Sequence, residues 1–216
     1  MENVFGTAIT NEYLKNHPDY EGRTKDFSVK ELAQYALDMM NENLENDNAR
    51  EYLKKLHEKY GSEGVDCMIY NATGAPMKSI DYKIWEGGVI SIPLETIENG
   101  QWGVFLHSKA TAKGALVLDA RYESGEKAEW LLGWRITNDS NSCFADFSES
   151  LTFSKAKSFE EKEKVWNQIE EGLTKNLVLF NKVSKGKTGY LVTRGGIGGT
   201  KRPVLDVMLS IISQDI

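Results

Sequence analysis

The sequence has little cysteine, little proline and no long hydrophobic run. Its 216 residues include 2 Cys and 4 Pro. Cys67 and Cys143 lie far apart in the chain, which fits two reduced, partly buried thiols in a reducing compartment. No stretch approaches the roughly 18 apolar residues of a membrane span, and residues 1–10 lack the basic start and apolar run of a secretory signal. We therefore expect a cytoplasmic protein without a transmembrane segment, and a nuclear location stays open.

Histidine is also scarce, and its placement does not indicate a metal site. His17, His57 and His107 share no metal-ligand spacing with a cysteine or a carboxylate, so we predict neither a metal nor another cofactor. An active site assembled from residues distant in the chain stays open, with Cys143, His107 and Asp119 as its candidates. No local signature supports such a site, and the sequence favours a protein that is not an enzyme.

Acidic residues outnumber basic ones, 32 Asp and Glu against 26 Lys and Arg, for a net charge of −6. The molecule as a whole therefore repels phosphate backbones, and general nucleic-acid binding is disfavoured. Several cations nevertheless gather towards the C-terminus, which leaves that end of the fold free to meet an anionic ligand. These cations are Lys185, Lys187, Arg194, Lys201 and Arg202.

A glycine-rich segment at 195–199 lies among these cations. Backbone amides in such a segment can bind oxyanions, so Arg194, Lys201 and Arg202 are candidates for an anion-binding loop. The segment does not match a nucleotide-binding loop, because Thr200 precedes the lysine and an apolar strand follows where a helix is required. A flexible loop or bulge without a ligand is the alternative.

Two capped amphipathic helices are predicted in the N-terminal part of the chain. Ser28 with Glu31 forms a capping box before an apolar repeat of helical period, and Asn48 with Glu51 repeats the pattern. We expect these helices to form a helical hairpin. With the irregular arm before it, the hairpin would make an N-terminal unit over residues 1–62 that packs on the core.

From residue 65 onward the hydrophobic period changes to 2, which predicts a sheet. Strands follow strands directly up to residue 137, so successive parallel βαβ units are excluded. We expect an α+β, mainly β fold: an antiparallel β-sandwich over residues 63–216 with an inserted helix near 159–172. The predicted strands are 65–71, 78–84, 89–94, 102–109, 114–122, 128–137, 176–184, 188–193 and 204–212.

The aromatic residues of the predicted sheet are candidates for a ligand-binding surface. Trp85, Trp102, Tyr122 and Trp134 would stack on a sugar ring or contact a choline headgroup through cation–π interactions if the sheet exposed them. Packing of the same rings in the core is the alternative. Replacing Trp134 by alanine separates the two, since a core ring contributes stability and a surface ring contributes ligand affinity.

Three segments resemble the 23 kDa jasmonate-induced proteins of plants. They are Val4-Phe5-Gly6-Thr7-Ala8-Ile9-Thr10, Ile69-Tyr70-Asn71-Ala72-Thr73-Gly74, and Ile97-Glu98-Asn99-Gly100-Gln101-Trp102-Gly103-Val104-Phe105-Leu106-His107. The resemblance runs through most of the chain and implies a role in stress and defence responses. It brings no catalytic residues.

A looser likeness concerns the fold. The order of Asn71 to Gly74, Trp85 before a glycine pair, residues 114–119 and then Trp134 is similar to that of the aegerolysins and actinoporin-like lipid-binding proteins. This resemblance implies a β-sandwich that recognises membrane lipids.

Three hypotheses for function follow. The first is a non-catalytic, jasmonate-responsive stress protein that binds a lipid headgroup or a carbohydrate through the four aromatics. The second is an enzyme built from distant residues. The third is a self-associating stress protein whose helices offer the partner surface, although we expect the apolar side chains of those helices to pack on the sandwich. These side chains are Tyr35, Met39, Met40, Tyr52 and Leu56.

Overall fold

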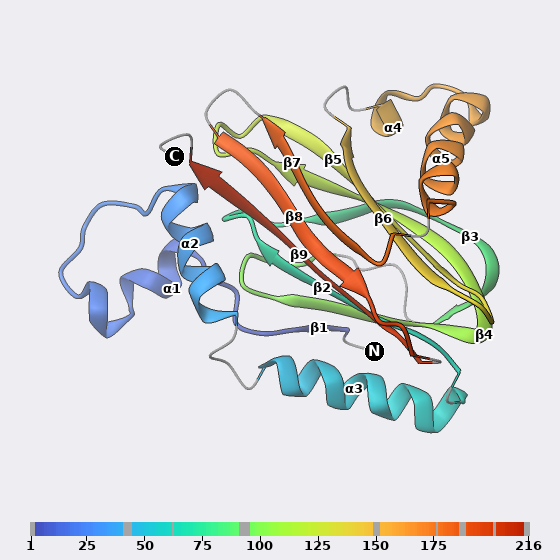
Figure 1. The fold of residues 1–216 in the computed structure, drawn as a ribbon. Helices are drawn as coiled ribbons and strands as arrows, with labels where there is room; N and C mark the ends of the chain where they lie inside the picture. The colour runs from blue at the N-terminus through green and yellow to red at the C-terminus, as the bar shows by residue number, and fades with distance from the viewer. Residues whose placement is uncertain are drawn as a thin grey trace.

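The computed structural model describes residues 3–40, 45–61, 63–90, 96–148, 152–175, 177–185, 189–200 and 202–213. It is mainly β, with one large curled sheet and several helices on its outside (Figure 1). The strands are β1 Val4–Phe5, β2 Gly64–Ala72, β3 Lys78–Ile90, β4 Trp102–Arg121, β5 Lys127–Ile136, β6 Asn141–Ser148, β7 Leu179–Lys185, β8 Gly189–Ile197 and β9 Val204–Ser213. The helices are α1 Asn11–Lys15, η1 Pro18–Tyr20, α2 Val29–Met39, α3 Glu45–Tyr60, α4 Thr152–Lys155 and α5 Phe159–Leu173.

The strands form a single sheet in the order β6-β5-β4-β2-β9-β8-β7, and β1 and β3 pair with β4. All pairs are antiparallel except β2 with β9. The two end strands approach each other where the Cys143 amide donates to the Leu177 carbonyl at 2.7 Å. The sheet is therefore nearly closed, like a barrel. The mainly β prediction is confirmed, but one curled sheet takes the place of the two-sheet sandwich.

Two strands run longer than predicted. The glycine pair after Trp85 does not end β3, because the strand passes it through register shifts between Ile84 and Gly88. Likewise β4 continues through residues 110–113, and Lys109 adopts a φ of 103° at the bend. A bulge adds a residue to one strand without ending the pairing, so turn-forming residues here bend the strands. Residues 91–95, the rest of the predicted 89–94 strand, lie outside the described residues.

The helix ends confirm two predicted caps and correct a third. Before α2, the Ser28 hydroxyl accepts from the Glu31 amide at 3.2 Å, and the Glu31 carboxylate accepts from the Ser28 amide at 2.8 Å. Before α5, Ser158 accepts from the Glu161 amide at 3.2 Å. The predicted cap at Asn48 is wrong, since α3 begins at Glu45 and Asn48 lies within its first turns.

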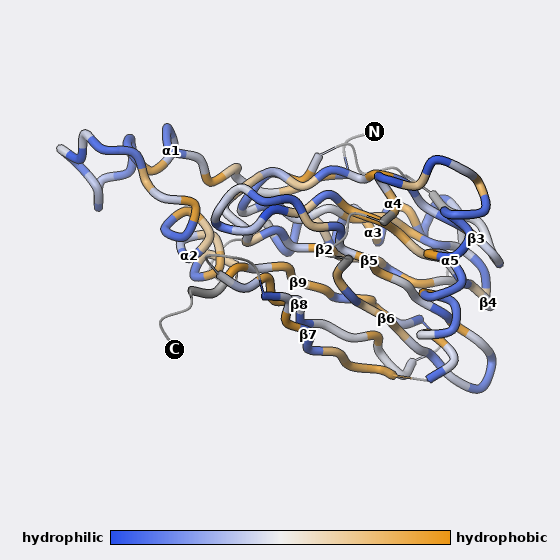
Figure 2. The backbone as a smooth tube through the Cα atoms, turned by 90° about the horizontal axis from the view of Figure 1, so that it is seen from above, coloured by the Kyte–Doolittle hydropathy of each residue, from blue (hydrophilic) through white to orange (hydrophobic). Residues whose placement is uncertain are grey.

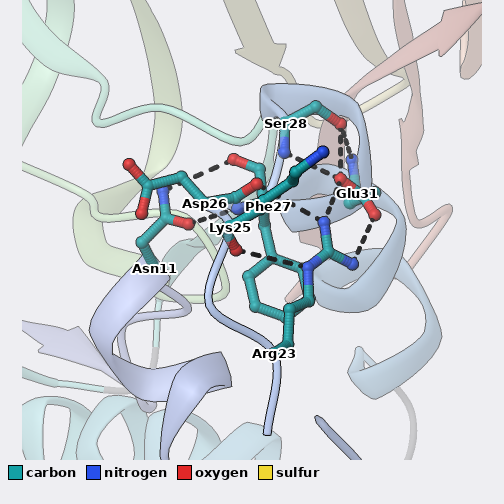
Figure 3. Close-up of polar contacts among 7 residues, drawn as sticks. All are labelled: Asn11, Arg23, Lys25, Asp26, Phe27, Ser28 and Glu31. Atoms are coloured by element: carbon teal, nitrogen blue, oxygen red, sulfur yellow. Dashed lines mark hydrogen bonds and ion pairs between the residues drawn. The ribbon is translucent and has the colours of Figure 1, made fainter.

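The segment before α2 is tied to that helix by a charged network (Figure 3). The Arg23 guanidinium donates to both carboxylate oxygens of Glu31, at 2.8 and 3.1 Å, and lies 3.8 Å above the Phe27 ring. The Asn11 side chain accepts from the Phe27 amide at 2.5 Å. The hydrogen bond from Arg23, with those from Ser28, lowers the pKa of Glu31 to about 2. The predicted irregular arm is thus an ordered segment with short helices.

The two N-terminal helices pack on the outside of the sheet, each against different strands. Helix α2 lies against β2 and β9, and α3 lies against β4 and β1 (Figure 1). The Tyr70 hydroxyl donates to the Ala36 carbonyl at 2.6 Å and fixes α2 on the sheet. The buried side chains under these helices include Leu32, Ala36, Leu53, Leu56, Met68, Tyr70 and Val104.

The outside of the sheet is only partly covered. Helix α5 packs on β5 and β6, and its residues Trp166, Ile169 and Leu173 cover Ala115, Val117 and Leu131. Side chains of the opposite parity, such as Trp130, Leu132 and Trp134, fill the interior. Among the described helices, none lies above the outer side of β7 (Figure 1).

Candidate functional site

Three of the four aromatic residues predicted to bind a ligand lie in the core. Trp102, Tyr122 and Trp134 are 2%, 3% and 0% exposed. The indole nitrogen of Trp134 donates to Nδ1 of His107 at 2.7 Å, and the Tyr122 hydroxyl bonds to Ser184 at 2.6 Å. This corrects the expectation of an exposed aromatic platform: Trp102 is covered in the cluster under α2 and α3, and Tyr122 and Trp134 are enclosed in the interior of the sheet.

Trp85 is the partly exposed member of the set, and its ring faces protein groups. The Lys83 and Lys113 ammonium groups lie 5.6 and 5.5 Å from its ring, and Trp166 of α5 meets it edge-on at 6.4 Å. The two lysines also form ion pairs with Glu163 and Glu170 of α5. Trp85 therefore helps to hold α5 on the sheet.

The candidates for an assembled active site are not brought together. His107 donates through Nε2 to the Glu86 carbonyl at 2.7 Å, and burial lowers the pKa of His107 to about 4. Burial also raises the pKa of the Cys143 thiol to about 12. Within the described ranges no hydrogen bond joins His107, Cys143 or Asp119 to one another. A neutral buried imidazole and a protonated buried thiol do not activate a nucleophile.

The structure also separates the members of the predicted anion-binding loop. The glycines at 195–196 belong to β8, and Arg194 lies on that strand opposite Asn181. Arg202 lies beyond the strand, where its Nε donates to Nε2 of His57 at 3.0 Å and lies 3.9 Å from Asp66. Lys201 is outside the described residues. Arg194 and Arg202 therefore do not lie in one loop, and the predicted anion-binding loop is not formed by them.

A polar cavity of about 600 Å³ opens beside Arg202. It lies between the turn that joins β5 to β6 and the segment that joins β8 to β9. Its walls combine a guanidinium with carboxylates, amides and hydroxyls, and Ile136 supplies an apolar part. The other lining residues are Glu63, Ala110, Thr137, Asn138, Asp139, Ser140, Asn141, Gly199 and Thr200.

The most unusual surface lies on β7. Among the described residues, four of the seven large hydrophobic side chains that stand exposed fall at positions 177–183. Leu179 and Val183 are 74% and 59% exposed, and Leu177 and Val178, directly before the strand, are 44% and 46% exposed. Figure 2 shows β7 at the outer edge of the molecule, with a hydrophobic stretch along it. Isolated exposed aliphatic side chains are ordinary, but a continuous row marks an interaction surface.

Strand geometry puts these aliphatic side chains beside cations. Leu179, Asn181, Val183 and Lys185 alternate with the buried Phe180 and Ser184, so they share the outer side of β7. Arg194 is the cross-strand partner of Asn181, between Leu179 and Val183. Lys182 is also exposed on the strand. Lys182 has the same parity as Phe180 and Ser184, so it lies on the opposite side of the strand. We call the set Leu179, Asn181, Val183, Lys185 and Arg194 the β7 face.

The β7 face is cationic without acidic partners. In the part of the chain that the structure describes, no carboxylate pairs with Lys182, Lys185 or Arg194. The sequence between Glu171 and Asp206 holds seven Lys and Arg residues and no Asp or Glu. Asp206, on β9, lies 3.7 Å from Arg50, and burial raises its pKa. A local excess of positive charge therefore exists in a chain of net charge −6.

Sequence reasoning found the C-terminal cations but missed the aliphatic row between them. Residues 177–180 read Leu-Val-Leu-Phe, so both sides of the strand carry apolar side chains. The hydrophobic pattern of these residues therefore does not indicate which side of the strand faces solvent. The acid-free stretch was the available signal, because a core strand has no need for so many cations.

Within the described ranges, no group of three His, Cys, Asp or Glu side chains is placed to hold a metal ion. The helices described there are also too short or too polar to cross a bilayer. The fold and its surface thus define a helix-decorated, nearly closed β-sheet protein with an apolar, cationic strand on its outside.

The chain belongs to the Nakanori-like protein family, whose model matches residues 5–209. It is 33% identical over 141 residues to the 23 kDa jasmonate-induced protein of Hordeum vulgare. That match covers 62% of this chain and 66% of the barley protein, slightly under two thirds of its length. The resemblance to jasmonate-induced proteins is thereby confirmed.

The crystal structure of the lipid binding protein Nakanori superposes with a TM-score of 0.74 at 21% sequence identity. The superposition covers 96% of this chain and 99% of Nakanori. At this identity the match shows a shared fold, and it confirms that the chain folds like a lipid-binding β protein.

Proposed function

We propose that this chain is a non-catalytic lipid-binding protein that attaches to membrane surfaces through its β7 face. The observation that carries the proposal is the exposed row of Leu179 and Val183 beside cations that have no acidic partner in the described structure. The fold shared with Nakanori, a protein described as lipid-binding, supports the same function. The barley relative's induction by jasmonate supports a setting in plant stress responses.

Physical chemistry favours a bilayer surface as the occupant of this row. An aliphatic side chain of this size gains about 1.5–3 kcal/mol when it moves fully from water into an apolar medium. Leu177 and Val178 add further exposed apolar surface directly before the strand. Peripheral attachment of this kind requires no spanning helix.

A second ligand class has its own observation. The wall of the cavity beside Arg202 carries amide, hydroxyl and carboxylate groups as well as apolar surface, a combination that suits a small polyhydroxylated ligand such as a sugar headgroup. We propose a carbohydrate as the alternative ligand. Asn138 and Asp139 lie in its wall, so Asn138→Ala with Asp139→Ala should abolish binding to a glycan array while leaving binding to plain phosphatidylcholine vesicles unchanged.

Vesicle flotation tests the lipid proposal. The double variant Leu179→Asn, Val183→Thr removes the aliphatic row while keeping a β-branched residue in the strand. We expect its binding to phosphatidylcholine vesicles that contain sterol to fall at least tenfold. Phe159→Gln is the matched control, because Phe159 is equally exposed but lies on α5, and it should bind like the unmodified chain.

Two results would overturn the proposal. The first is equal flotation of the double variant and the unmodified chain. The second is a dimer in light scattering that Leu179→Asn converts to a monomer while vesicles bind neither form, since the row would then be an interface between two copies of the chain.

A further inference from the structure

The cations of the β7 face indicate which membranes it meets. Lys185 lies on the same side of the strand as Leu179 and Val183, and Arg194 lies between those two across the ladder. Long basic side chains can lay their stems along apolar surface and keep their charged heads in water. Inserted aliphatic side chains would thus place the ammonium and guanidinium groups at the depth of the lipid phosphates.

From this geometry we infer that the β7 face selects anionic phospholipid over zwitterionic phospholipid, an inference that rests on the function proposed above. A zwitterionic headgroup offers one cation for each phosphate, so it gives unpaired protein cations little net attraction. An anionic headgroup leaves the phosphate charge uncompensated, and each Lys or Arg near such a surface strengthens binding about fivefold.

The charge distribution of the rest of the molecule adds orientation to this attraction. Outside the stretch between Glu171 and Asp206, acidic residues outnumber basic ones by more than in the chain as a whole. An anionic surface therefore repels most of the protein and attracts this side, which favours encounters with β7 towards the bilayer. The attraction is screened within about 10 Å at 0.1 M salt and about 3 Å at 1 M.

The same cations alone would suit a nucleic acid, but the row between them does not. Sequence-independent binding of nucleic acids uses basic grooves with aromatic rings for base stacking. Leu179 and Val183 are aliphatic and stand exposed between Arg194 and Lys185. A phosphate backbone would leave them in water, whereas a lipid surface buries them.

The experiment compares two triple variants of identical net charge. Lys182→Gln, Lys185→Gln, Arg194→Gln neutralises the two cations of the β7 face and the exposed Lys182 of the same strand. Lys25→Gln, Lys55→Gln, Lys164→Gln neutralises three exposed lysines on the arm, α3 and α5. Both are titrated against vesicles of phosphatidylcholine alone and of phosphatidylcholine with phosphatidylserine, at low and high salt.

We expect the unmodified chain to bind the phosphatidylserine vesicles more tightly, with the gain lost at high salt. The β7 triple variant should lose roughly a hundredfold on those vesicles and keep its binding to phosphatidylcholine alone. The control triple should stay within about threefold of the unmodified chain. Lys182→Arg with Lys185→Arg should bind like the unmodified chain, since it keeps the charge.

The outcomes separate this inference from the proposed function. Equal binding to both vesicle types, or equal losses in the two triple variants, overturns the anionic selectivity and leaves lipid binding standing. Displacement from vesicles by short DNA at equal charge concentration would also overturn it in favour of a nucleic-acid partner. Binding to neither vesicle type refutes the proposed function, and the inference falls with it.

Discussion

Replacing His107 by glutamine tests the buried hydrogen-bond chain that joins β3, β4 and β5. His107 is fully buried, donates to the Glu86 carbonyl at 2.7 Å and accepts from the Trp134 indole at 2.7 Å. Gly87 makes this approach feasible, because a Cβ there would lie 2.4 Å from Nε2 of His107. The site therefore accepts one neutral tautomer and leaves no room for a second proton on Nδ1.

The size of the stability loss at low pH follows from the linkage between proton binding and folding. Burial lowers the pKa of His107 from 6.5 to about 4, so between these values the unfolded chain takes up a proton that the folded chain does not. A depressed histidine pKa thus favours the unfolded state as the pH falls through this window, and the stability it allows is fully present above pH 6.5. At about 1.4 kcal/mol per pH unit, the loss reaches about 3 kcal/mol near pH 4.

The assay is urea unfolding at pH 7 and at pH 4, followed by tryptophan fluorescence. Other groups also titrate in this window, so the informative quantity is the difference between the unmodified chain and His107→Gln. We expect the variant to be about 1–3 kcal/mol less stable at pH 7, because glutamine reproduces the two hydrogen bonds imperfectly. This difference should shrink or reverse at pH 4. A difference that is the same at both pH values would refute the reasoning.

Three further predictions follow from contacts in the fold. Arg23→Ala should raise the pKa of Glu31 from about 2 towards its ordinary value in an NMR titration, and should change the free energy of unfolding little because the pair is partly exposed. Gly133→Ala should lower the free energy of unfolding by about 1–3 kcal/mol, since its Cβ would lie 2.6 Å from Ile169 of α5, and urea unfolding measures this. Cys143 should resist a thiol reagent at pH 8 until the chain unfolds, because burial raises its pKa to about 12; rapid labelling of the folded chain would contradict its placement.

Local features of the fold could be predicted from the sequence, and long-range ones could not. The caps at Ser28 and Ser158 depend on residues three positions apart, and the structure confirms both. Asn48 has the same local pattern, but α3 already begins at Glu45 and includes the exposed Asp47 and Asn48. A cap pattern therefore suggests a helix start, but the same pattern can also occur within a helix.

The curl of the sheet depends on pairings that no local pattern encodes. The parallel pairing of β2 with β9 joins Asp66 to Val204, residues far apart in the sequence. Period 2 groups side chains by side without saying which side is enclosed. That is why Trp134, grouped with other aromatics as a surface candidate, proves to be interior. For the same reason the outer position of Leu179 was not predicted.

The exposed lysines of β7 could recognise lipid or could protect an edge strand from pairing with another copy. Arg194 distinguishes these two explanations. Edge strands often carry lysine because charge prevents pairing with another copy, and Lys182 and Lys185 lie on an end strand of the sheet. Arg194 lies on β8, which is paired on both sides, so protection of an edge does not account for its exposure beside Leu179. Arg194→Gln alone should therefore weaken binding to phosphatidylserine vesicles about fivefold without promoting aggregation. If the variant aggregates and binds those vesicles normally, the cations protect the strand and do not recognise lipid.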